Sequence, residues 1–360
     1  MKGGEHIINV DSFQVEEIQE FLNAFSGSDH LNVSFTDIME NLAGGNLTGI
    51  LQSYTEVLKE LLFSELAANR TLLIQIMILA VIGAVFSGFS GIFGSGQVGE
   101  TGFYVIYLLI MSFLTIGFFA SIRVTVEVTD QLLGFMQVLF PAYFLAVTAA
   151  GGALTSASIC GFTIGAIGLV QTILSEILIP LIRIFLLLVM AGNLMKEDML
   201  SKLTELLSQG IVWVMKTLFG GIVGFQVIQG MILPQADAVK NASLLRLAQA
   251  IPGIGGGAGA VSQLVMGAGV MIKNTAGAAA VVVLLLLTAI PVLKLCILTG
   301  LYYLAAAVMQ PVCDKRLVSC MTGAAVGHEL LLKLVVYSVA MFILTIAIIC
   351  ISTNAVWYVG

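Results

Sequence analysis

The chain has 360 residues, of which 59% are hydrophobic and only 10% are charged, and its formal net charge is −6. Soluble globular domains carry about a quarter charged residues, so this composition excludes an ordinary soluble domain, and the acidic balance excludes nucleic-acid binding through a basic surface. We therefore expect an all-α polytopic membrane protein. It should have about eight to ten transmembrane or re-entrant helices, preceded by an amphipathic helical N-terminal region.

Residues 1–70 form an acidic region that we expect to be extracytoplasmic or interfacial. Apolar residues recur at helical spacing over Asp11–Phe25, and Ser34-Phe35-Thr36-Asp37 resembles a capping box before a short helix. A further apolar stripe over residues 47–62 predicts a helix that packs on its neighbours, or else docks on a partner or the bilayer surface. No apolar h-region follows the first residues, so we expect targeting to rely on the first span or a native leader to be absent from this sequence.

Residues 71–360 form the multi-span transmembrane domain, because a span needs roughly 20 apolar residues. A polar turn at 123–130, a connector at 193–209 and a loop at 311–333 are expected to separate spans. Residues 251–272 are uncharged but rich in glycine, which predicts a broken or re-entrant helix. The other expected spans are 72–93, 103–122, 132–150, 153–174, 177–192, 211–233, 276–295, 296–310 and 334–353.

A candidate internal repeat covers about 132–240 and 243–353, and it is either parallel or inverted. An offset of 111 residues superposes Pro141 on Pro252 and Pro180 on Pro291. Transport proteins are often built from two repeats, with interrupted helices at the site between them. The candidate broken-helix positions are Pro141, Gly151, Gly152, Pro180, Pro252, Gly255, Gly256, Gly257 and Pro291.

Three ionisable residues in or beside spans, Glu176, Arg183 and Lys294, are candidate pathway or interhelical polar residues. A charge in the membrane costs a few kcal/mol, so it usually faces a cavity or a partner. The alternative is that each side chain extends to the interface. We find no spacing of cysteine, histidine or carboxylate residues that indicates a catalytic or metal site, and we expect no cofactor and no enzymatic activity.

Basic residues favour the cytoplasmic side of a membrane. The connector with Lys196 and Lys202 is therefore predicted to be cytoplasmic, and the acidic N-terminal region is predicted to be exported. The side of the loop that carries Lys315 and Arg316 depends on whether residues 251–272 cross the membrane.

Several segments resemble the stage III sporulation protein AE family of endospore-forming bacteria. They are the stretch from Gly45 to Glu65, Phe140-Pro141-Ala142-Tyr143 with Gly151-Gly152, Ile179-Pro180-Leu181, Pro252-Gly253-Ile254-Gly255 and the closing multi-span region. The resemblance implies a subunit of the mother cell–forespore channel complex, placed in the outer forespore membrane and needed for late forespore gene expression. It also implies partners among the other stage III A-operon proteins, including an ATPase on a separate chain and ring-forming proteins.

Three functions stay open at this point. The chain is a transport or channel subunit whose glycine-rich segments line a water-accessible path, or a membrane scaffold that recruits partners through residues 1–70 and the loops. The third alternative is an autonomous secondary transporter.

Overall fold

A computed structural model describes most of the chain as helix, and no strand occurs among the described residues. These residues are 15–25, 34–44, 55, 59–60, 62–71, 74–78, 81–82, 85, 96–149, 153–194, 199–249 and 255–352. The all-α polytopic class is thereby confirmed, and five of the described helical stretches are long and apolar enough to cross a membrane.

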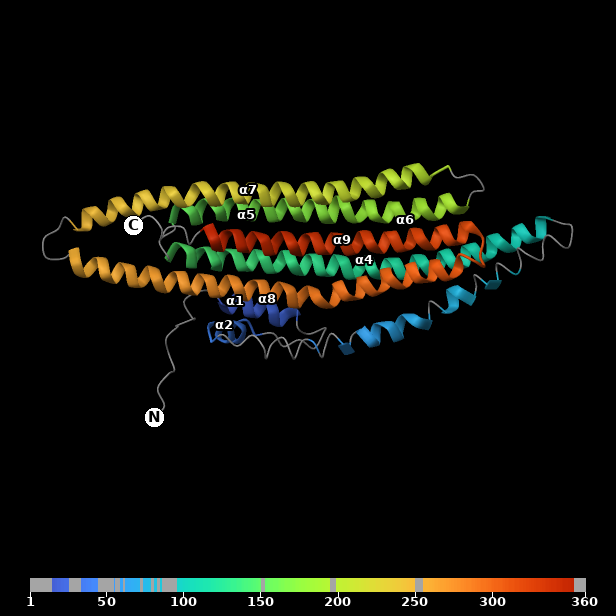
Figure 1. The fold of residues 1–360 in the computed structure, drawn as a ribbon, viewed down its shortest axis with the longest axis horizontal. Helices are drawn as coiled ribbons and strands as arrows, with labels where there is room; N and C mark the ends of the chain where they lie inside the picture. Colours follow the sequence, from blue (N-terminus) through green and yellow to red (C-terminus); the bar gives the residue numbers. More distant parts are fainter. Residues whose placement is uncertain are drawn as a thin grey trace, which may run out of the picture.

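The long helices run back and forth along the long axis of the bundle (Figure 1). Two short helices precede them, and a seven-residue π-helix joins α5 to α6 without a turn. In chain order the elements are α1 (Val15–Phe25), α2 (Phe35–Ala43), α4 (Gly96–Ala149), α5 (Ala153–Gln171), η2 (Thr172–Leu178), α6 (Ile179–Leu194), α7 (Ser201–Gln249), α8 (Gly255–Met309) and α9 (Lys315–Ser352).

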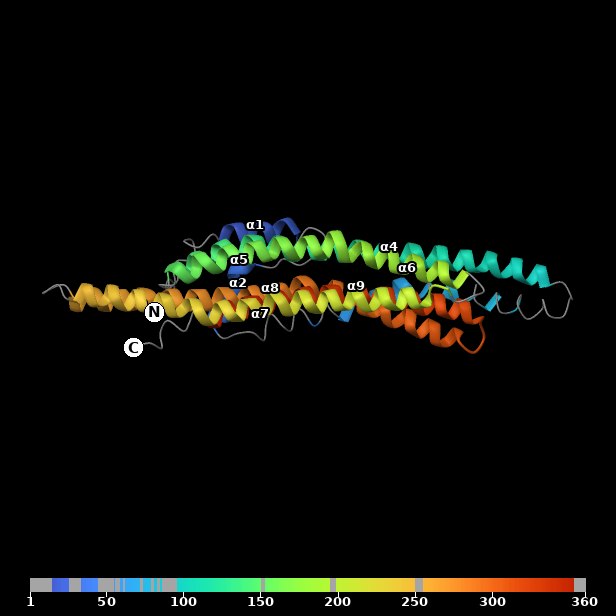
Figure 2. The same ribbon diagram turned by 90° about the horizontal axis from the view of Figure 1, so that it is seen from above.

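The bundle has two layers, which separate when it is seen from above (Figure 2). One layer holds α4 and the continuous α5–η2–α6 rod, and the other holds α7, α9 and α8, with α9 between its two neighbours. Because α9 also packs on α4 and α6 of the first layer, it is the central helix of the bundle. Its inward face is lined by small residues such as Gly323, Ala324 and Gly327, which let neighbouring helices approach closely.

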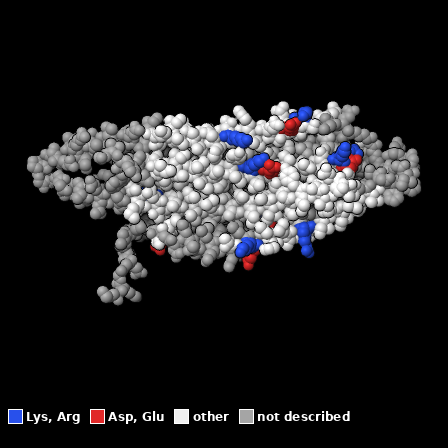
Figure 3. Space-filling view, in the orientation of Figure 1, with Lys and Arg blue, Asp and Glu red and all other residues white. Residues whose placement is uncertain are grey.

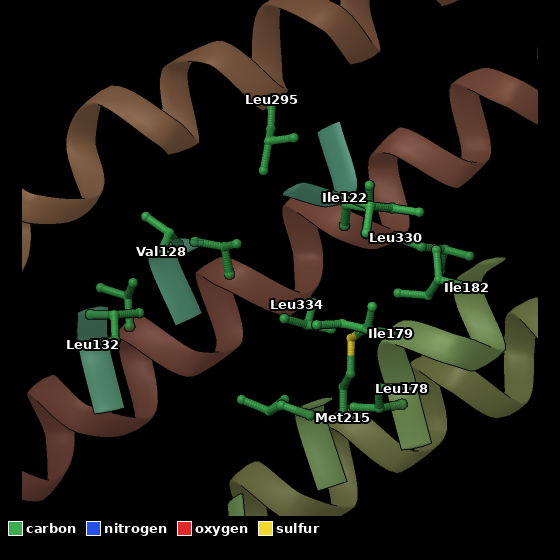
Figure 4. Packing of buried hydrophobic residues seen from close by; sticks show 14 of the residues in the cluster. Ile122, Val128, Leu132, Leu178, Ile179, Ile182, Met215, Leu295, Leu330 and Leu334 are labelled. Atoms are coloured by element: carbon green, nitrogen blue, oxygen red, sulfur yellow. The ribbon is translucent and has the colours of Figure 1, made fainter. Parts of the chain in front are cut away.

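The apolar core lies where the two layers meet (Figure 4). Ile122 of α4, Ile182 of α6 and Leu330 of α9 are each at most 2% exposed and point toward one another. Met215 of α7 and Leu295 of α8 close the same cluster from the outer helices. All five long helices therefore share one core at mid-length.

Several buried threonine and serine hydroxyls bond to the backbone of their own helix, although that of Thr163 is buried without a partner. In α4 the Thr125 hydroxyl donates to the Ser121 carbonyl at 2.9 Å, and the Thr129 hydroxyl donates to the Thr125 carbonyl at 2.8 Å. Thr345 of α9 donates to the Met341 carbonyl in the same way. An apolar surrounding offers no water to such groups, so internal bonding is what allows them inside this bundle.

Several predicted breaks between spans are wrong, because the chain continues as helix there. The loop expected at 311–333 is one of them, since α9 begins at Lys315. α4 runs through the expected turn at 123–130, the π-helix joins the expected spans at 153–174 and 177–192, and α8 joins the segments expected at 276–295 and 296–310. The physical reason is clearest in α4, where Arg123, Glu127 and Asp130 are spaced by about one helical turn and are all exposed. These charges mark an outer face and do not end a helix.

The prediction of a broken or re-entrant helix at residues 251–272 is also wrong in the part that the structure describes. Residues 255–272 are part of α8, so this portion is regular helix, whereas residues 251–254 lie outside the described residues. The expected first span at 72–93 is described only in part.

The short helices α1 and α2 pack on the bundle, α1 against α4 and α2 against α8. Ile18 and Leu22 of α1 and Phe35 of α2 are almost fully buried. The predicted capping box is present in part, because the Asp37 amide donates to the Ser34 hydroxyl at 3.2 Å. These two helices therefore attach the described part of the N-terminal region to the transmembrane domain.

Candidate functional site: a charged belt at mid-length

Aromatic contacts fix which levels of the long helices lie side by side. His328 of α9 lies 4.5 Å from the ring of Tyr302 on α8 and 5.3 Å from that of Phe118 on α4, measured between ring centroids. Nine residues farther along α9, which is about two and a half helical turns, the ring centroid of Tyr337 lies 5.9 Å from that of Phe219 on α7. Half of the Asp, Glu, Lys and Arg residues of the long helices lie within a few turns of this level. We call them, with Glu65, the charged belt: Glu65, Arg123, Glu127, Asp130, Glu176, Arg183, Lys216, Lys294, Glu329 and Lys333.

Ion pairs tie parts of the belt together. Lys294 Nζ lies 2.8 Å from Glu65 Oε1, which connects α8 to the helical segment at 62–71. Lys333 Nζ lies 2.6 Å from Glu329 Oε1 on α9, and the Tyr303 hydroxyl donates to Glu329 Oε2 at 2.6 Å. The partners are partly exposed, so these contacts stabilise the surface only modestly. In Figure 3 such charges form small patches on a largely white surface.

Two of the three candidate pathway residues, Glu176 and Arg183, are exposed on the outer surface of the α5–η2–α6 rod. Glu176 lies within the π-helix, and no ion pair joins the two residues in the described part of the chain. Lys294 is more shielded, with 38% of its side chain exposed, and is paired with Glu65. A path lined by Glu176 and Arg183 would therefore run between this chain and a partner, and not through the core of a single chain.

The candidate broken-helix positions have different surroundings. Pro141 and Pro291 lie inside α4 and α8, so neither proline ends its helix. Pro180 is the second residue of α6, directly after the π-helix. Gly255, Gly256 and Gly257 open α8. Gly151, Gly152 and Pro252 lie outside the described residues.

The helices that the 111-residue offset aligns run in matching directions along the bundle. The offset places the connection between α6 and α7 near the connection between α8 and α9. Figure 1 shows that α5–α6 and α8 run in one direction, whereas α7 and α9 return in the other. The internal repeat stays a prediction, and a duplication of these hairpins would be of the parallel kind.

Sequence reasoning missed two buried polar residues. Lys273 of α8 is fully buried, although it follows a segment that was expected to be re-entrant. His328 is also fully buried, and its Nδ1 lies 2.8 Å from the Ala324 carbonyl oxygen. A short polar interruption of an apolar run was the available signal in both cases, since Lys273 is followed by Asn274 and Thr275 and His328 is followed by Glu329. No group of three metal-ligating side chains occurs in the described part of the chain.

The charged belt therefore places charged side chains on the outer surface of the bundle. Its ion pair between Lys294 and Glu65 links α8 to the N-terminal region. This arrangement suits contact with lipid headgroups or with charged partner chains.

Comparisons with known proteins agree with the resemblance in the sequence. The family model described as "Stage III sporulation protein AE" matches residues 33–353. Over 369 aligned residues the chain is 23% identical to a protein named "Stage III sporulation protein AE" from Bacillus subtilis (strain 168), with 94% of this chain and 89% of that protein covered. No solved structure matches the chain at a significant level.

Proposed function

Because the chain belongs to the stage III sporulation protein AE family, we propose that this integral membrane protein is a subunit of the channel or secretion-like complex that links mother cell and forespore. In this role it supports late forespore gene expression from the outer forespore membrane, which is a mother-cell membrane. Its partners are the other stage III A-operon membrane proteins, an ATPase on a separate chain and ring-forming proteins. The subunit acts by assembly and not as an enzyme.

The family match over residues 33–353 is the observation that carries this proposal. The structure adds a physical reason for assembly, since Glu176 and Arg183 lie on the outside of the bundle. Exposed charges at mid-length are costly against hydrocarbon. A partner chain or a water-filled space beside the bundle would relieve that cost.

The test is deletion of the gene in a spore-forming host, followed by complementation. Wild type, Glu176→Ala, Arg183→Ala and Pro180→Ala would be compared, with late forespore gene expression as the readout. Protein level and membrane insertion serve as controls, and Lys202→Ala is the matched variant because Lys202 is 92% exposed at the end of the bundle. We expect deletion to block expression and Arg183→Ala to reduce it while Lys202→Ala restores it. Normal sporulation after deletion would contradict the proposal.

The second candidate function is a scaffold that recruits partners without contributing to a path. The acidic outer face of α1 and α2 favours it, because Glu16, Glu20, Asp37 and Glu40 are exposed while the opposite face packs on the bundle. Such a face fits a basic surface on a partner. The scaffold predicts that neutralising these four residues blocks late expression, whereas the Glu176 and Arg183 variants restore it. Transport by the purified chain alone would instead favour an autonomous transporter.

A further inference from the structure

A pocket lies at the end of the bundle where α6 ends and where α7 and α9 begin. It has a volume of about 570 Å³, which is within the range of ligand sites in proteins. The connection from α6 to α7 and the connection from α8 to α9 meet at this end (Figure 1). The pocket is separate from the charged belt.

The outer part of this pocket carries two cationic side chains from the first turn of α9. Lys315 is exposed and forms no ion pair with any residue that the structure describes. The Arg316 guanidinium is held in place, since its Nε lies 3.4 Å from Asp314 Oδ1 and its Cζ lies 3.7 Å from the centre of the Phe103 ring. Arg316 Nη1 is nevertheless buried without a hydrogen-bond partner. A buried donor without a partner is costly. Because Arg316 itself lines the pocket, a ligand acceptor that reaches its guanidinium would relieve that cost.

Hydroxyl groups add further donors near the two cations. Ser201 and Ser319 line the pocket, and no hydrogen bond from either hydroxyl occurs in the described structure. One carboxylate, that of Glu205, also lines the pocket. It is engaged with Lys202, whose Nζ lies 3.0 Å from Glu205 Oε2, so it opposes an anionic ligand only weakly.

The inner part of the same pocket is apolar. It is lined by Phe185, Leu188 and Val189 of α6 and by Gly323 and Val326 of α9. A free inorganic anion would use only the outer, cationic part. A ligand that matches both parts has an anionic head and a hydrocarbon portion.

We propose that this pocket binds an anionic phospholipid, with the phosphate against Lys315 and Arg316 and an acyl chain along the apolar part. Basic pockets between membrane helices on the cytoplasmic side are suited to such headgroups. The basic residues at this end of the bundle favour that side of the membrane. The lipid site is independent of whether the protein belongs to a channel complex.

The test uses the purified full chain in detergent and measures lipid binding by native mass spectrometry. The probes are phosphatidylglycerol and phosphatidylcholine with identical acyl chains, and inorganic phosphate as a competitor. Lys315→Gln and Arg316→Gln each remove one charge, and Lys216→Gln is the control, because Lys216 is exposed on α7 and lies outside the pocket lining. Ser319→Trp fills the pocket and leaves both charges in place. Thermal unfolding of each variant confirms that it is folded.

We expect wild type to prefer phosphatidylglycerol and each charge-removing variant to bind it about fivefold more weakly, as expected from about 1 kcal/mol per basic residue at a membrane surface. Lys216→Gln should bind like wild type, and Ser319→Trp should lose the lipid. Equal binding of both lipids, or binding that is unchanged in Lys315→Gln and Ser319→Trp, would overturn the proposal. Displacement by inorganic phosphate as effective as by phosphatidylglycerol itself would assign a phosphate site instead and overturn the lipid.

Discussion

At the scale of single residues, Gly323 of α9 packs directly against Val189 of α6. A Cβ built at this position would collide with Val189 of α6, whereas a Cβ at Gly300 of α8 meets nothing within 4 Å. Both glycines lie inside long helices. Gly323→Ala should therefore destabilise the protein by about 1–3 kcal/mol through overpacking. Gly300→Ala should be neutral or stabilise it by up to about 1 kcal/mol, because alanine favours helix over glycine.

Thermal unfolding of both variants in the same detergent checks this prediction. An equal melting temperature for the two variants would mean that α6 and α9 are not in close contact at Gly323.

The site residues show what a sequence can predict and where it stops. Glu176, Arg183 and Lys294 could be picked out because charges are rare in apolar runs. Which way each side chain points could not be predicted, since the π-helix at Thr172–Leu178 changes the phase of the rod between its two halves. The partner of Lys294 could not be predicted either, because Glu65 lies more than 200 residues earlier in the chain.

At the scale of helices, the apolar segments were predictable and their joins were not. The runs expected at 103–122 and 132–150 both lie within α4. The three charged residues between these runs, Arg123, Glu127 and Asp130, are spaced so that one helix carries all of them on its outer face. The length of the apolar runs alone does not predict this continuous helix. Residues 276–295 and 296–309 likewise lie in α8, which continues through Pro291 and ends one residue before the predicted end of its span. The chain therefore has fewer and longer helices in its described part than the span count predicted.

The length of these helices has a consequence for the membrane. α4 has 54 residues, which corresponds to about 80 Å at 1.5 Å per residue. The hydrocarbon core of a bilayer is only about 30 Å thick. Hydrocarbon can therefore cover only part of the bundle, and the exposed residues of the charged belt should be in contact with water, either outside the hydrocarbon or in a water-filled space beside the bundle.

Cysteine labelling in sealed membranes checks the position of the belt. In a cysteine-free background, Arg183→Cys and Lys216→Cys should react with a water-soluble maleimide from one side. Val105 and Leu145 lie on either side of the belt in α4 and are 55% and 52% exposed. In at least one of the variants Val105→Cys and Leu145→Cys, the cysteine should not react with the maleimide, because lipid covers its side chain. Protection of both belt positions would place the belt in hydrocarbon or under a partner, and labelling in detergent would then separate these two cases.

At the scale of the whole molecule, the fold places the start of α9, whose side the sequence left open, at the same end of the bundle as the start of α7. The connection before α7 and the connection before α9 lie at the same end of the bundle (Figure 1). Lys202, Lys315 and Arg316 are therefore neighbours in space although they are far apart in the chain. A single end that collects these basic residues is expected to be cytoplasmic, and the far end of α9 is expected to be on the opposite side.

Epitope tags inserted after Met199 and after Val312 test this arrangement. Both residues are well exposed, at 70% and 56%, so short insertions should be tolerated. Antibody should reach neither tag in intact cells and both tags after permeabilisation, whereas a tag beyond the C-terminus should be reached from outside once the wall is removed. Tags after Met199 and Val312 on different sides would mean that the two hairpins do not lie parallel. The same result would separate Lys202 from Lys315 and Arg316 across the membrane, so the basic residues could no longer set the orientation together.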